Sequence, residues 1–328
     1  MSNVFSVSQS KIKTYRSCRR AYHNKYVLKL RRKRVKRPFI FGRIVHEMIE
    51  AHAAGDDPMA KLDSIDLHSG KMFRAEREMY GDILEDIRVI MDEYFKHWGD
   101  ELVYSRKLKR WAEFPFEIEI ADGLVFKGKI DGVGRSRKMR WLVEHKTFTR
   151  QPNEDDQWRS VQSAVYIRAV QINGWWSDIE GTLWDYIRSK PPATPGLLKN
   201  GEISRARLDS LPNRVKAFIV ASGKDPKKYK ELIKTAEDNR SSYFIRAYSP
   251  IKPAVIDDTW SDFLETALEI RDNHGKSKTR TISKNCSWCD FEPLCRAEMQ
   301  GLDTDYIIKR EYTTDPEDKL DETNSEEE

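Results

Sequence analysis

The chain has 328 residues, of which 39% are hydrophobic and 34% are charged. This balance is typical of a polar globular protein that can bury a core, in one large domain or two modest ones. No apolar run approaches the length of a transmembrane helix, and the first residues lack the basic and apolar regions of a secretion signal. We therefore expect an intracellular, cytoplasmic protein without membrane contact, whose four cysteines are reduced or metal-bound rather than paired as disulfides.

Charge is distributed unevenly along the chain, whose net charge is +5. Residues 311–328 contain nine acidic side chains and one basic side chain, and removing that segment's −8 leaves +13 on the rest. A basic body favours a polyanionic partner such as DNA. The acidic end, residues 301–328, is expected to be a disordered, solubilising tail, and competition of this tail for a DNA-binding groove is the weaker alternative.

Residues 6–26 have the pattern of a helix that contains Cys18, with Ser8 or Ser10 as its N-cap. The densest basic run follows at residues 31–37. A solvated loop and a phosphate-binding loop are both open interpretations of this run. In the second case, the phosphate contacts would come from Arg31, Arg32, Lys33 and Arg34.

A second helix is predicted to start at Pro38, because proline favours the first helical turn. Gly42 and His46 lie one turn apart on it, so a backbone or a ligand can approach the imidazole across the glycine. A lone histidine on a helix is more often structural than a ligand, and this alternative stays open. Residues 57–70 are expected to form a connecting loop, and residues 72–98 a long amphipathic scaffold helix.

The next elements are predicted to be strands, at residues 111–120 and in a hairpin at 124–146. Asp131 is expected to end the first hairpin strand, and alternation along the second strand places Glu144 and Lys146 on one face. Two carboxylates and a lysine at a hairpin mouth can hold Mg²⁺ or Mn²⁺ and a water. The alternative is a surface hairpin whose charges only keep a sheet edge soluble.

Helices and short strands alternate beyond the hairpin. Gln162 and Tyr166 share one face of a helix predicted at residues 155–173. Residues 190–203 are rich in proline and glycine and are expected to form a loop. The other predicted elements are strands at 181–188 and 242–248, and helices at 204–222, 224–239 and 257–273.

The cysteines fall into two groups. Cys286, Cys289 and Cys295 are close together in the sequence, and Cys18 is far upstream. Four thiolates can hold Zn²⁺ or an iron–sulfur cluster, and the spacing does not separate the two. Four unrelated buried thiols are the alternative. A metal bound by all four would join the two ends of the chain and close a long loop.

Taken in order, these motifs resemble those of the PD-(D/E)XK nuclease superfamily, in its RecB-like branch. They are most similar to the iron–sulfur exonucleases that include the AddB nuclease domain, CRISPR-associated RecB-like exonucleases and phage-encoded relatives. Each motif is short, but their shared order over residues 6–300 makes the resemblance specific. The chain departs from the superfamily pattern at Ile130, where proline usually precedes the acid. The matching motifs are Gly42-x-x-x-His46, Gly128-x-x-Asp131, Glu144-x-Lys146, Gln162-x-x-x-Tyr166 and the one-plus-three cysteines.

The resemblance implies a restriction-endonuclease-like α/β fold. In this fold a central mixed sheet is flanked by helices, and N-terminal and C-terminal helical segments are joined by the metal cluster. It also implies that His46, Asp131 and Glu144 bind Mg²⁺ or Mn²⁺ together with the backbone carbonyl of His145. Lys146 would then orient or activate the attacking water.

The resemblance further implies that Gln162 and Tyr166 position DNA beside the metal. Cys18, Cys286, Cys289 and Cys295 would hold a [4Fe–4S] cluster, with zinc as the alternative. The expected divisions of the chain are an N-terminal helix and basic run at 1–37, a nuclease core at 38–189, an insertion at 190–256, a C-terminal helix and three-cysteine segment at 257–300, and the tail at 301–328.

The implied function is that of a metal-dependent DNA exonuclease acting on single strands or DNA ends, in recombination, repair or phage DNA metabolism. The resemblance alone suggests 5′→3′ polarity. One alternative is the same nuclease trimming DNA ends during CRISPR spacer acquisition. Another is a non-catalytic, metal-stapled nucleic-acid-binding module, which needs only the cysteines, the basic run and aromatic side chains. The expected partners are DNA and a recombinase, helicase or integrase.

Overall fold

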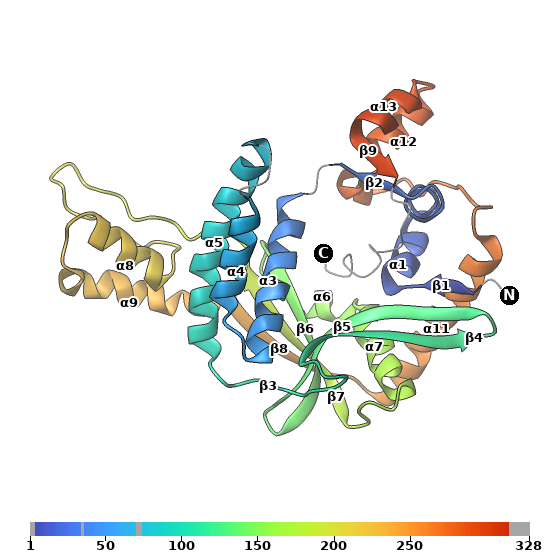
Figure 1. The fold of residues 1–328 in the computed structure, drawn as a ribbon, viewed down its shortest axis with the longest axis horizontal. Helices are drawn as coiled ribbons and strands as arrows, with labels where there is room; N and C mark the ends of the chain where they lie inside the picture. Colours follow the sequence, from blue (N-terminus) through green and yellow to red (C-terminus); the bar gives the residue numbers. More distant parts are fainter. Residues whose placement is uncertain (1–3, 34–35, 70–73, 315–328) are drawn as a thin grey trace.

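The computed structural model describes residues 4–33, 36–69 and 74–314, and its central feature is a seven-stranded mixed sheet with helices on both faces (Figure 1). The predicted fold class, a restriction-endonuclease-like α/β fold, is confirmed. None of the described helices is long and apolar enough to cross a membrane. Arg34, for which phosphate contact was predicted, lies outside the described residues. Residues 315–328, which were predicted to belong to a disordered tail, also lie outside them.

The sheet has the strand order β1-β5-β6-β7-β8. Strands β1 and β6 pair along one edge of β5, and strands β4 and β3 pair along its other edge. The pairs β1/β5 and β6/β7 are parallel, and the other pairs are antiparallel. The strands are β1 (Phe5–Val7), β3 (Val103–Tyr104), β4 (Ala112–Ala121), β5 (Leu124–Ser136), β6 (Met139–Phe148), β7 (Ile179–Arg188) and β8 (Phe244–Pro250).

The hairpin of β5 and β6 is paired only near its turn. Its ladder begins at Ser136 and Met139 and ends at Gly132 and Val143. Beyond that point β5 continues along β4, and β6 continues along β7. Asp131 therefore lies within β5, and the prediction that it ends the strand was wrong, because pairing with β3 and β6 extends β5 to Ser136. Backbone pairing between β5 and β6 stops beside this carboxylate.

Three helices cover one face of the sheet: α3 (Arg37–Ala54), α4 (Pro58–Ser69) and α5 (Arg74–Trp98). Their apolar side chains share a core with Ile187 of β7 and Phe244 of β8. The prediction of a loop at residues 57–70 was wrong, since this segment is α4. Leu62 is fully buried in the core, and Met59 packs against it three residues earlier, so one face of α4 is apolar.

The opposite face is covered by α7 (Val161–Ile172) and α11 (Pro253–Asn273), with α1 (Gln9–Ser17) beside α11. The helix predicted at residues 6–26 is interrupted at Cys18, whose backbone is extended, and continues as α2 (Arg19–Tyr22) and a π-helical turn (His23–Val27). Ser8, one of the two residues predicted as the N-cap, caps α1. The helix predicted at 155–173 is similarly divided into α6 (Glu154–Trp158) and α7.

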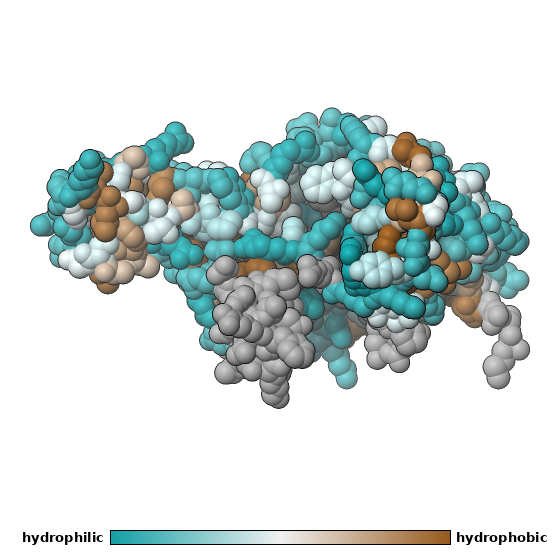
Figure 2. Space-filling view, turned by 90° about the horizontal axis from the view of Figure 1, so that it is seen from above, coloured by the Kyte–Doolittle hydropathy of each residue, from teal (hydrophilic) through white to brown (hydrophobic). Residues whose placement is uncertain are grey.

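The segment between β7 and β8 projects beyond α5 (Figure 1). It consists of α8 (Pro212–Ala221), the 3₁₀ helix η2 (Pro226–Tyr229) and α9 (Lys230–Asp238), which enclose a small core of their own. The short helix α10 (Arg240–Tyr243) then leads into β8. The face shown in Figure 2 is mostly hydrophilic, with hydrophobic residues on this projecting segment and on the opposite side of the view.

An N-terminal segment and the C-terminal segment of the described chain meet in a small subdomain. It contains η3 (Lys284–Trp288), α12 (Glu292–Met299) and α13 (Thr304–Glu311), and β9 (Tyr312–Thr314) pairs with β2 (Leu30–Arg32). The prediction of a disordered tail from residue 301 was therefore wrong for residues 304–314. Tyr312 is buried with Leu30 and stacks on Phe291, and this apolar contact orders the segment.

Candidate active site

The structure brings the histidine of α3 to the point where β5 and β6 separate. His46 is 5% exposed, and its Nε2 lies 3.3 Å from the carbonyl oxygen of His145 on β6. Its Nδ1 lies 4.0 Å from Oδ1 of Asp131 on β5. The other oxygen of Asp131, Oδ2, accepts a hydrogen bond of 2.8 Å from the backbone N–H of His145. The Asp131 carboxylate thus accepts a backbone N–H of β6 at the point where β5–β6 pairing has stopped, and this bond holds Asp131 beside His145.

Glu144 and Lys146 form the second part of the site. Lys146 Nζ lies 2.7 Å from Glu144 Oε1, and Gln162 on α7 donates a 2.8 Å hydrogen bond from Nε2 to the same oxygen. Burial raises the pKa of Glu144 to about 7; the charge of Lys146 opposes this rise and that of Asp131 adds to it.

Glu113 on β4 is a site residue that the sequence reasoning missed. Its Oε1 lies 3.0 Å from His46 Nδ1, and its Oε2 lies 2.7 Å from Nζ of Lys129. Burial disfavours the charged form of Glu113, but the hydrogen bond and charge of His46 and the charge of Lys129 outweigh burial and lower its pKa to about 2. His46, Glu113 and Asp131 offer ligand atoms that all lie within 4.8 Å of one another.

These groups fit a divalent cation. A nitrogen and a carbonyl oxygen that both present lone pairs repel each other at 3.3 Å unless a proton or a cation lies between them. Adjacent ligands of an octahedral cation with bonds of 2.0–2.1 Å stand about 3 Å apart, which is close to this separation. With the buried carboxylate of Asp131 beside them, His46 Nε2 and the His145 carbonyl make a mixed nitrogen and oxygen donor set suited to Mn²⁺ or Mg²⁺.

The side chain of His145 faces away from this donor set. Its Nδ1 lies 3.2 Å from Asp185 Oδ2 on β7, and its Nε2 lies 2.9 Å from the hydroxyl of Tyr104. Tyr94 of α5 also donates to Asp185, and Arg246 of β8 donates to it at 3.4 Å. His145 therefore presents its backbone to the site, while its ring is held in a buried polar network on the α5 side.

Tyr166 and Gly128, from two separate motifs, are in contact. Tyr166 is 2% exposed, and its ring packs against Phe116 and Phe126 in the core. A Cβ placed on Gly128 would lie 2.5 Å from Phe116 Cζ and 3.3 Å from the Tyr166 hydroxyl. The motif glycine thus leaves room for two rings. Tyr166 packs in the core, and its role in positioning DNA stays a prediction.

The basic run contacts the C-terminal segment. Arg31 donates to the Lys25 carbonyl, Arg32 pairs with Glu311 at 2.5 Å, and Lys33 donates to the Lys309 carbonyl. The contacts of Arg32 and Lys33 connect the basic run to α13. Phosphate binding by Arg31, Arg32, Lys33 and Arg34 stays a prediction.

The four cysteines lie in the subdomain that joins the chain ends, and each sulfur accepts one N–H donor. The donors are the backbone N–H groups of Thr281 to Cys18, Ser283 to Cys286 and Phe291 to Cys289, and the guanidinium of Arg280 to Cys295, at 3.3–3.5 Å. Such donors stabilise thiolates that bind metal. The sulfurs are not tightly clustered, however, since no three of these described cysteines lie within 4.8 Å of one another.

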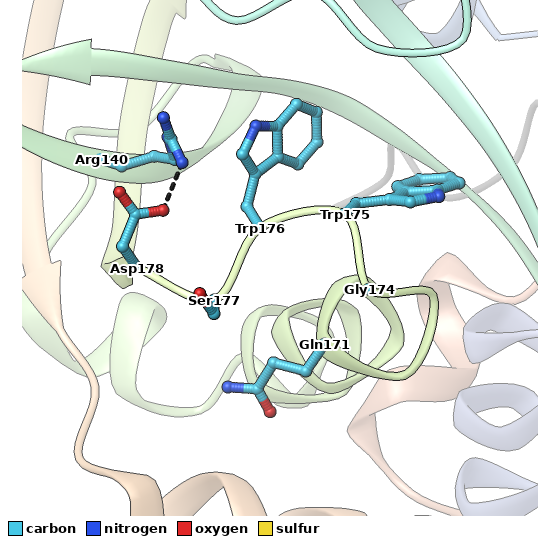
Figure 3. Close-up of a pocket in the computed structure, with 7 residues that line it drawn as sticks. All are labelled: Arg140, Gln171, Gly174, Trp175, Trp176, Ser177 and Asp178. Atoms are coloured by element: carbon cyan, nitrogen blue, oxygen red, sulfur yellow. Dashed lines mark hydrogen bonds and ion pairs between the residues drawn. The ribbon is translucent and has the colours of Figure 1, made fainter.

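A shallow pocket lies elsewhere, between the end of α7 and the starts of β6 and β7 (Figure 3). It is lined by Trp175 and Trp176 and by the ion pair of Arg140 with Asp178. Glu144 and Lys146 lie further along β6, toward its carboxyl end. The pocket is therefore separate from the candidate active site.

The match of the chain to a protein-family model agrees with this arrangement. The family model described as the PD-(D/E)XK nuclease superfamily matches residues 6–296, a span that contains every motif of the site. Among solved structures, the crystal structure of SSO0001 shares 16% sequence identity over 68% of this chain and 75% of that chain, with a TM-score of 0.29. A comparison with curated proteins found no match.

Proposed function

Because this chain belongs to the PD-(D/E)XK nuclease superfamily, we propose that it is a metal-dependent DNA exonuclease of the RecB-like branch. The observation that supports this most is that the His46 imidazole, the backbone of His145 and the Asp131 carboxylate lie together at the split between β5 and β6. A DNA substrate agrees with the charge of the chain, which is +13 before residue 311. Action on single strands or DNA ends, and 5′→3′ polarity, rest on the resemblance of the motifs.

Four groups of this chain would hold the cation: His46, Asp131, Glu144 and the carbonyl of His145. A bound Mg²⁺ or Mn²⁺ would supply positive charge that polarises the phosphodiester and increases the acidity of water. Lys146 is the group best placed to hold the attacking water, because its Nζ lies beside Glu144 and its side chain is 14% exposed. The same ammonium can donate to the charge that develops on the phosphoryl oxygens.

Cleavage of end-labelled DNA tests the proposal. Single-stranded, double-stranded and circular single-stranded DNA are incubated with Mn²⁺ and either wild type, Lys146→Ala or the control Lys127→Ala. Lys127 is a half-exposed lysine of β5 that pairs with Glu117. We expect wild type and the control to degrade linear DNA and leave circles intact, with Lys146→Ala slower by about 10²–10³-fold. Equal rates for both variants would contradict the role of Lys146, and cleavage of circles would contradict exonuclease action.

We also propose that Cys18, Cys286, Cys289 and Cys295 hold a structural [4Fe–4S] cluster. The N–H donor on each sulfur supports metal-bound thiolates. A tetrahedral zinc site with bonds of 2.3 Å would bring all four sulfurs to about 3.8 Å from one another, whereas no three of these described cysteines lie within 4.8 Å of one another. Iron and sulfide analysis of protein purified without oxygen tests this assignment, and one zinc per chain without iron would overturn it.

A further inference from the structure

Glu113 has an unusual backbone for a residue in a strand. Its neighbours pair regularly with β5, Ala112 with Gly132 and Phe114 with Ile130, yet its φ is +55°. This left-handed conformation is sparsely populated by residues other than glycine, asparagine and aspartate. Three successive residues of β4, from Ala112 to Phe114, are buried, so the usual alternation of the strand is broken here. The backbone turns Glu113 inward, toward α3.

Both carboxylate oxygens of Glu113 are engaged. Oε1 faces Nδ1 of His46 at 3.0 Å, and Oε2 faces the ammonium of Lys129 at 2.7 Å. The Glu113 side chain is 6% exposed. Because a carboxylate can only accept in this contact, Nδ1 of His46 carries the hydrogen and donates it. A histidine that binds a metal is neutral, so in the metal-bound state its lone pair is on Nε2, the nitrogen that faces the His145 carbonyl.

We infer that Glu113 is a positioning residue for the metal centre, an assignment that rests on the proposed function. Glu113 fixes the tautomer and the ring rotation of His46, so that Nε2 is presented to the cation. Lys129 holds the carboxylate in place from the other side. Carboxylates that accept from the second nitrogen of a metal-binding histidine orient the ring and raise its basicity. Glu113 acts through His46, because its Oε1 faces Nδ1, the ring nitrogen opposite the one that faces the His145 carbonyl.

Two substitutions separate this role from folding. Glu113→Gly removes the carboxylate without adding backbone strain, because glycine adopts positive φ readily. Glu113→Gln keeps the shape of the side chain and an oxygen that can accept from Nδ1. The matched control is Glu117→Gln on the same strand. Glu117 forms an ion pair with Lys127 of β5, as Glu113 does with Lys129, but at the surface.

The measurements are the Mn²⁺ dissociation constant, by titration calorimetry, and the nitrogen coupling of bound Mn²⁺, by pulsed electron paramagnetic resonance. We expect Glu113→Gly to bind Mn²⁺ 10–100-fold more weakly, with reduced nitrogen coupling. We expect Glu113→Gln to restore most of the affinity, and Glu117→Gln to match wild type.

Wild-type affinity and coupling in Glu113→Gly would overturn the inference and leave the nuclease intact. Absence of nitrogen coupling in wild type, with metal-dependent cleavage retained, would overturn the role of His46 as a ligand and this inference with it. Absence of both metal binding and cleavage in wild type would overturn the proposed function itself.

Discussion

Gln162 and Glu144 are joined by a hydrogen bond of 2.8 Å from the amide Nε2 to the carboxylate Oε1. The two residues come from different motifs, one on α7 and one on β6. The same carboxylate oxygen lies 2.7 Å from Lys146 Nζ, so the amide and the ammonium hold it from two sides. Because Glu144 is 2% exposed, no bulk water replaces a partner that is lost.

Substitution of Gln162 should therefore weaken catalysis while the fold persists. Removing one partner of a buried charged group costs about 1–3 kcal/mol, which corresponds to roughly 5–150-fold in rate. We expect Gln162→Ala to lower the cleavage rate within this range. Gln171→Ala, at the exposed end of the same helix, is the control and should keep the wild-type rate. Equal rates for the two variants would show that the contact with Glu144 has no catalytic consequence.

Gly128→Ala should destabilise the protein. The added methyl group would lie 2.5 Å from Phe116 Cζ and 2.8 Å from Phe116 Cε1, and both Phe116 and Tyr166 are confined in the core. Overpacking of this kind costs about 1–3 kcal/mol. Urea unfolding should show this loss for Gly128→Ala but not for Gly196→Ala, since an added Cβ at Gly196 meets nothing within 4 Å. A stability equal to that of Gly196→Ala would mean that the rings can move aside.

The contribution of His52 to the stability of the folded state should fall as the pH is lowered below 6.5. Burial lowers the pKa of His52 below 6.5, against the charge of Asp100. Between the folded and unfolded pKa values the unfolded chain binds the proton more readily, so protonation favours unfolding. The buried Glu144, whose pKa is raised, acts in the opposite direction. The contribution of His52 is therefore isolated by comparison with His52→Gln.

The comparison is made by urea unfolding between pH 7.5 and 5.5 in the presence of a chelator. The free energy of unfolding of wild type, relative to that of His52→Gln, should fall as the pH is lowered through this range. A difference that stays constant with pH would contradict a lowered pKa for His52.

Cys289→Ser should remove the iron–sulfur cluster and weaken the subdomain that joins the two chain ends. Loss of a structural metal site removes a constraint between distant segments, so the melting temperature should fall. We expect a brown wild-type protein and a colourless, iron-free Cys289→Ser variant. Ser287→Ala, an exposed change between two of the cysteines, should stay brown. A wild type that is colourless and iron-free would contradict the cluster.

Local spacing in the sequence identified most of the site. His46, Glu144, Lys146 and Gln162 were found because helical and strand periodicities fix which residues share a face. Their motifs lie in the order that the family shares, and the structure connects Gln162 to Glu144 and His46 to the backbone of His145. The fold class followed from the resemblance of these ordered motifs to the superfamily.

The sequence could not reveal Glu113, because three glutamates occur in β4 and all resemble solvent-facing residues of an alternating strand. Only the positive φ of Glu113, a consequence of tertiary structure, turns it inward. The disorder predicted from residue 301 was wrong for residues 304–314 for a related reason. Their order depends on Tyr312 packing against Leu30 and Phe291, a contact between distant parts of the chain.

The position of bound manganese tests the central claim most directly. An anomalous difference map, measured at the manganese edge from crystals grown with Mn²⁺, would locate the ion without reference to activity. We predict one strong peak at the split of β5 and β6, contacted by His46 Nε2, the carboxylates of Asp131 and Glu144, and the carbonyl oxygen of His145. A map with no peak there, or with manganese bound only at other residues, would contradict the proposed metal centre.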